Sequence, residues 1–297
     1  MSLEFKDGFV SKPRNRWIVN VVLVLAVLAF VGVSMVPLIG AFNQTQSSTQ
    51  QSPNARSGSP SSDQKSKLED AARGYEQVLQ RESENQTALR GLLETRLQLL
   101  SLGVGEIKSV IEPLEKLAKL NPEQTRYAVL LAQAKQQIGD KEGAAQAYRS
   151  VLENKPGNLD ALQGMVALLL DQKRPEAAIG LLQDTLNSAS QANKIQPGSV
   201  DTVAVQVLLG NVHASQKRYA QALTAYDEAI KNDQQDFRPA LAKAMLLKEQ
   251  GKTEEAKILF TKAAALAPTQ YKDEINKQAS ESPSATPTAT PTPNSTP

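Results

Sequence analysis

The chain has 297 residues, with 33 Lys and Arg against 31 Asp and Glu, one histidine and no cysteine. The lack of cysteine excludes disulfides, thiolate zinc sites and cysteine nucleophiles. Residues 65–279 carry 28 Lys and Arg against 27 Asp and Glu, so no basic face indicates nucleic-acid binding.

The first predicted element is an apolar helix at residues 17–42, after a short polar N-terminus at 1–16. No residue of this helix is charged, and about 20 apolar residues suffice to cross a bilayer. A cleaved signal peptide is the alternative. Its apolar core would be about 7–15 residues long and would end at a small-x-small site, which Ile39-Gly40-Ala41 matches poorly. We therefore predict a retained, single-pass transmembrane helix.

The charges flanking this helix predict its orientation. Four Lys and Arg precede it and only Arg56 follows closely; because these residues favour the cytoplasmic side, the rest of the chain is expected on the other side. Residues 43–64 are rich in Ser, Gln, Thr, Asn and Pro. They cannot bury enough apolar surface to offset the entropy of ordering, so a disordered linker is expected. The Ser/Thr/Pro-rich tail at 280–297 is expected to be disordered for the same reason.

Residues 65–279 are predicted to be almost wholly helical. A helix at 67–81 has its apolar residues at helical spacing and resembles the second helix of a pair whose first helix is missing. The segments 87–100 and 106–120 form the next pair, which ends at Asn121-Pro122 because proline cannot continue a helix.

A pattern of 34 residues then recurs from Thr125, from Leu159 and, twice without a gap, over 203–268. In the last two copies small residues occupy positions 8, 20 and 27 and an aromatic occupies position 24. Short helices pack closely only where small residues meet and a large side chain fills the remaining space, so the pattern predicts a helix–turn–helix solenoid. Residues 187–199 interrupt the register and are expected to form a surface loop, the alternative being a functional insertion. A short polar helix at 271–278 should cap the array.

These residues resemble the tetratricopeptide repeat family. The resemblance implies an all-α solenoid of about five helix pairs that binds a client protein or peptide in a concave groove, with the copies at 203–268 favoured as the docking surface. One subgroup of the family binds the C-terminal carboxylate of heat-shock chaperones through Lys and Asn at positions 5 and 9, and this pair does not occur here. The resemblance places groove-facing side chains at positions 2, 5, 9 and 12: Arg126, Val129, Gln133, Gln136, Asp160, Gln163, Ala167, Leu170, Ala204, Val207, Asn211, Ala214, Arg238, Leu241, Met245 and Lys248.

No catalytic, cofactor or metal site is expected. His213 falls at position 11, on a face that usually packs inward, and no metal cluster or catalytic triad can be built around it, since catalysis needs convergent partners. The glycines at 103 and 105 follow no strand and precede no Lys-Ser/Thr, unlike a phosphate-binding loop. We predict that the chain is not an enzyme.

The overall layout, with Met1-Ser-Leu-Glu-Phe and Asn15-Arg-Trp17 near its start, resembles cyanobacterial and plastid membrane-anchored tetratricopeptide proteins of thylakoid biogenesis. The resemblance implies a scaffold or assembly factor for chlorophyll biosynthesis or photosynthetic complexes, in a thylakoid or plasma membrane, with protochlorophyllide oxidoreductase as a client. That enzyme lies on the cytoplasmic side, which conflicts with the flanking charges. The alternative is a periplasmic envelope chaperone that assists protein export.

Overall fold

The computed structural model describes residues 62–281. Within this range the chain forms twelve α-helices and one 3-10 helix, and it contains no β-strand. The helices are α2 (Ser62–Arg81), α3 (Gln86–Ser101), η1 (Ile107–Val110), α4 (Ile111–Leu120), α5 (Thr125–Gln137), α6 (Lys141–Asn154), α7 (Leu159–Asp171), α8 (Pro175–Ile195), α9 (Thr202–Ser215), α10 (Tyr219–Asn232), α11 (Phe237–Glu249), α12 (Thr253–Leu266) and α13 (Thr269–Ser280).

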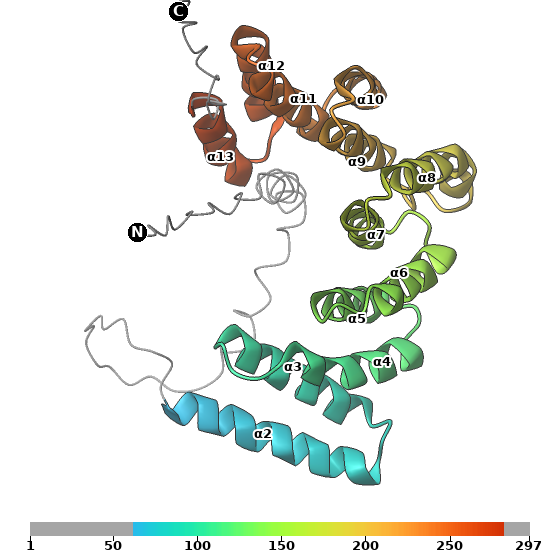
Figure 1. Ribbon diagram of the computed structural model, residues 1–297, viewed down its shortest axis with the longest axis vertical. Helices are drawn as coiled ribbons and strands as arrows, with labels where there is room; N and C mark the ends of the chain where they lie inside the picture. Colours follow the sequence, from blue (N-terminus) through green and yellow to red (C-terminus); the bar gives the residue numbers. More distant parts are fainter. Residues whose placement is uncertain (1–61, 282–297) are drawn as a thin grey trace, which may run out of the picture.

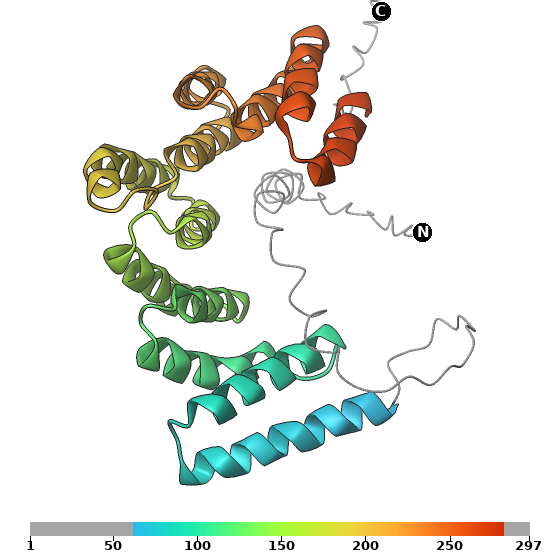
Figure 2. The same ribbon diagram turned by 180° about the vertical axis from the view of Figure 1, so that it is seen from behind.

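The helices stack in chain order into an open arc, with α2 at one end and α12 and α13 at the other (Figure 1). Each helix packs mainly on its sequence neighbours. The first helices of the four repeats, α5, α7, α9 and α11, lie on the inner side of the arc, and the second helices, α6, α8, α10 and α12, lie outside them, as the reverse view also shows (Figure 2). This is the predicted solenoid.

The aromatic residue at position 24 explains why the helices approach closely. Tyr226 is 2% exposed, and a Cβ added to Gly210 of α9 would lie 2.3 Å from its ring. Tyr148 packs instead on Gly164 of α7, the first helix of the next repeat, where an added Cβ would lie 2.2 Å from the ring. A ring can sink this far only where the facing residue has no side chain, so glycine and tyrosine together set the spacing.

Helix α2 has the role that the sequence predicts, that of a second helix without a first. Its Tyr75 packs on Gly91 of α3, where an added Cβ would lie 2.3 Å from the ring. In both contacts the glycine lies sixteen residues after the tyrosine: Gly91 after Tyr75, and Gly164 after Tyr148. The helix begins at Ser62 and α13 ends at Ser280, so the helical region extends slightly beyond both predicted ends.

The prediction of a surface loop at 187–199 is wrong for most of its length, because α8 continues to Ile195. Ala189 is 1% exposed and joins the core beside Leu182, so the added turns bury a small-residue face. The short loop that follows is closed by Asn193, whose amide nitrogen donates to the carbonyl oxygen of Val200 at 2.9 Å and whose amide oxygen accepts from the backbone N–H of Val200 at 2.9 Å.

No helix between residues 62 and 281 is long and apolar enough to cross a membrane. The predicted transmembrane helix at 17–42, most of the predicted linker and most of the predicted tail lie outside the described residues.

Candidate protein-binding surface

All sixteen predicted binding residues belong to the helices on the inner side of the arc, α5, α7, α9 and α11. Their accessibility differs widely. The exposed ones are Arg126, Gln133 and Asp160. The half-buried ones are Gln136, Gln163, Ala167, Leu170, Ala214, Arg238, Met245 and Lys248, and the buried ones are Val129, Ala204, Val207, Asn211 and Leu241.

Asn211 is buried because its side chain makes a hydrogen bond inside the repeat. Its side-chain oxygen accepts a hydrogen bond from the Tyr226 hydroxyl at 2.7 Å, and the side chain is 7% exposed. Asn211 follows Gly210, over which the tyrosine ring lies, so the hydroxyl reaches it directly. Burial also raises the pKa of Tyr226, which keeps the phenol neutral and able to donate.

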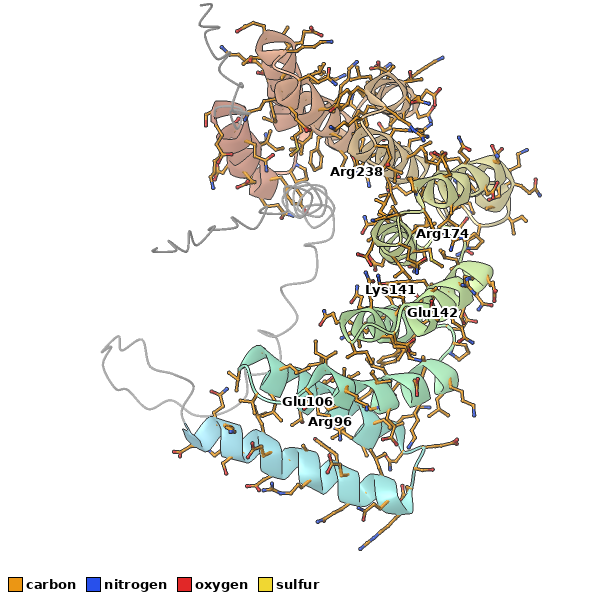
Figure 3. All side chains as sticks on the ribbon, in the orientation of Figure 1. Arg96, Glu106, Lys141, Glu142, Arg174 and Arg238 are labelled. Atoms are coloured by element: carbon orange, nitrogen blue, oxygen red, sulfur yellow. The ribbon has the colours of Figure 1, made fainter. Side chains whose placement is uncertain are left out.

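Arg238 ties two repeats together. Its guanidinium lies 2.8 Å from Asp201, which caps α9, and 2.5 Å from Asp236, which caps α11; Figure 3 labels Arg238 where these helices meet. Burial acts to lower the pKa of Arg238, but the hydrogen bonds to Asp236 and Asp201 outweigh it and raise that pKa. Asp201 was not singled out from the sequence; an Asp before an apolar helix is a typical N-cap.

Lys248 is the second inner-face cation held within the protein. Its ammonium group donates to the backbone carbonyl of Gln278 near the end of α13 and lies 5.7 Å from the centroid of the Phe260 ring. Positive charge stabilises the C-terminus of a helix. The rings of Phe237 and Tyr271 are stacked, with centroids 5.5 Å apart. This stacking and the hydrogen bond from Lys248 hold α13 against the last repeat.

Freely accessible polar side chains of the predicted set therefore gather on α5 and α7. These two helices are tied to their neighbours by the ion pair of Lys135 with Glu115 at 2.8 Å and that of Lys141 with Asp171 at 2.5 Å. Lys141 and Glu142 are labelled at the start of α6 in Figure 3. The exposed members of the set therefore give α5 and α7 polar groups and charges of both signs.

His213 packs inward, as predicted. It is 8% exposed, and its Nδ1 has no hydrogen-bond partner among residues 62–281. Burial lowers the pKa of His213, and the charge of Arg218 lowers it further, while Glu176 partly opposes them. The imidazole lines a shallow hollow of about 300 Å³ between α9 and α10. Residues 62–281 contain no group of three or more His, Asp or Glu that could hold a metal ion.

The model of the tetratricopeptide repeat family matches residues 64–267. The protein SLOW GREEN 1, chloroplastic, of Arabidopsis thaliana is 28% identical over 186 residues, covering 63% of this chain and 56% of that protein. Cellulose synthase operon protein C of Pseudomonas fluorescens is 33% identical over 118 residues, covering 37% of this chain and 9% of that protein. The chain thus spans about half or less of these curated relatives.

Solved structures include two similar helical arrays. Yeast Tom70 is 16% identical, with a TM-score of 0.47, over 70% of this chain and 42% of that one. A thermophilic tetratricopeptide repeat protein of Thermus thermophilus is 20% identical, with a TM-score of 0.40, over 64% of this chain and 98% of that one.

Proposed function

The chain belongs to the tetratricopeptide repeat family, and we propose that it is a membrane-anchored scaffold that holds a client protein on the inner face of its arc. Stacked repeats of this kind present an extended concave surface and generally work as non-enzymatic binding modules. The observation that carries the proposal is the placement of Arg126, Gln133 and Asp160, which are exposed on the inner helices α5 and α7.

The mixed character of this surface suits a helix or an extended segment of another protein. Arg126 and Asp160 offer charges of both signs, whereas Leu170 and Ala167 of α7 offer half-buried apolar area. The helical backbone is already ordered before a partner binds, so only the side chains have to be immobilised. A client with alternating polar and apolar groups would therefore find complementary contacts along the arc.

For the biological setting, we propose an assembly factor that supports chlorophyll biosynthesis or photosynthetic complexes, with protochlorophyllide oxidoreductase as a candidate client. The support is the similarity to SLOW GREEN 1, whose name assigns it to the chloroplast, and the resemblance of the layout to thylakoid-biogenesis proteins. In this setting the apolar segment 17–42 anchors the scaffold, and the helical arc works close to the membrane.

A second candidate is a periplasmic envelope chaperone. The observation that favours it is the charge asymmetry around the segment 17–42, with four Lys and Arg before it and Arg56 after it. Protease treatment of sealed right-side-out vesicles separates the candidates. Digestion of the repeats only after lysis would contradict the periplasmic function, and digestion in intact vesicles would contradict the cytoplasmic one.

The binding proposal is tested with two matched triple variants of the full chain. One replaces Arg126, Gln133 and Asp160 on the inner face by alanine. The control replaces three exposed residues of the outer helices α6 and α8 by alanine: Arg149, Gln183 and Asp184. Proteins that co-purify with the wild type from native membranes should be lost from the inner-face variant and kept by the control. Equal loss, or no loss, would contradict the proposed surface.

A further inference from the structure

Helix α2 presents a face that every complete repeat covers. In the four repeats the residues at position 20 of the second helix are at most 1% exposed, and those at position 27 are at most 5% exposed, because the first helix of the same pair lies over them. The equivalent residues of α2 are Ala71 and Val78. Both are exposed, and Val78 has 40% of its surface accessible.

This face runs along the whole of α2. Gln64, Lys67, Ala71, Gly74, Val78 and Arg81 follow one another at alternating spacings of three and four residues, the pattern by which one helix packs along another. An added Cβ at Gly74 would meet no atom within 4 Å. Tyr75 and the opposite side of α2 are already engaged with α3, and α2 is the outermost helix at its end of the arc (Figures 1 and 2).

Residues 43–61, which directly precede α2, lack the large apolar residues of a first helix. A first helix packs large apolar residues against its pair, as Leu131 and Leu162 do here. Residues 43–61 contain no Leu, Ile, Val, Met, Phe, Tyr or Trp. The unpaired α13 of another copy does not fit either, because Gln278 stands at position 8, where the close approach needs a small residue.

One charge pair favours a second α2 that runs antiparallel to the first. With a two-fold axis between Gly74 and Tyr75, Ala71 of one copy faces Val78 of the other. Lys67 faces Glu82, the residue after α2, whose N–H donates to the carbonyl of Val78 at 2.9 Å. One carboxylate oxygen of Glu82 accepts from the Asn85 amide at 2.7 Å, and the carboxylate keeps its negative charge for Lys67. The symmetry forms the Lys67–Glu82 pair twice, whereas a parallel arrangement would place Lys67 against Lys67. The small residues at the centre let the helix axes come close.

We propose that the exposed face of α2 is a self-association surface, on which a second copy of this chain packs its own α2 in antiparallel orientation. One helix face of this length is at the lower end of specific interface sizes. The association is therefore weak in dilute solution and is favoured where copies are concentrated.

Single cysteines test the geometry directly, because the chain has none of its own. A helix rises 1.5 Å per residue, so two Gly74→Cys residues lie near the axis, within reach of a disulfide, whereas two Arg81→Cys residues lie about 20 Å apart. Under mild oxidation of the full chain in detergent, Gly74→Cys should give a cross-linked dimer. Arg81→Cys should give no more cross-linked dimer than Ile258→Cys, a control residue on α12 that is 71% exposed.

Charge exchange supplies the second measurement. In the Gly74→Cys background, Lys67→Glu should lower the cross-linked fraction severalfold by creating two Glu–Glu contacts, and adding Glu82→Lys should restore it. If Gly74→Cys formed no more cross-linked dimer than Ile258→Cys, the proposal would be wrong, and the occupant of this face would be another protein. Equal cross-linking of Arg81→Cys would also overturn it, since that requires parallel helices.

Discussion

Replacing Gly210 by alanine should destabilise the chain, although alanine is the better helix former. The added methyl group would lie 2.3 Å from Cε1 and 2.7 Å from Cδ1 of Tyr226. The ring is 2% exposed and its hydroxyl is held by Asn211, so it has little room to move. Overpacking of this kind costs about 1–3 kcal/mol, while the better helix propensity returns about 0.5–1 kcal/mol. The net loss should be up to about 2.5 kcal/mol.

The matched control is Gly180→Ala in α8, where an added Cβ meets nothing within 4 Å. It gains the helix propensity without the collision and should raise stability by about 0.5–1 kcal/mol. Thermal unfolding followed by circular dichroism compares the two, since 1 kcal/mol shifts the midpoint of a domain of this size by about 2–4 °C. Equal stabilisation by both variants would refute the idea that the glycine–tyrosine contact sets the helix spacing.

Two further predictions concern buried polar groups. Because burial lowers the pKa of His213 in the folded chain, the unfolded chain binds more protons as the pH falls through about 6.5, so the free energy of unfolding should decrease there. His213→Gln should remove that part of the decrease, and identical urea-unfolding profiles at pH 8 and 5.5 would contradict the assignment. Asn211→Ala should cost about 1–3 kcal/mol by leaving the Tyr226 hydroxyl unpaired. Adding Tyr226→Phe should recover part of that loss in the same assay, and no recovery would count against the hydrogen bond.

The solenoid could be predicted because its cause is local and repeated. A ring at position 24 among small residues must be buried between helices, and Tyr148, Tyr226 and Phe260 are all at most 3% exposed. The same reasoning identified α2 as an unpaired second helix, since Tyr75 carries the pattern alone. The extension of α8 was missed because polar residues occur equally in loops and on exposed helix faces. Only the burial of Ala189 distinguishes them.

The binding surface was predictable in outline and not in detail. Position numbers correctly place all sixteen residues on the inner helices, because helical periodicity is local. They do not reveal that Asn211 accepts from a tyrosine on the next helix, or that Arg238 pairs with Asp201 of another repeat. Such pairings depend on tertiary contacts between distant positions. Among the sixteen residues, the three exposed ones lie on α5 and α7, and those of the last two repeats are half-buried or buried.

Site-specific photo-crosslinking tests the central claim most directly. A photoreactive amino acid would be placed at Gln133 on the inner helix α5 or at Gln183 on the outer helix α8, both exposed, and the full chain irradiated in its native membrane. We expect adducts to one client protein from Gln133 and none from Gln183. Adducts that form from Gln183 and not from Gln133 would show that the chain binds its client on the outer face.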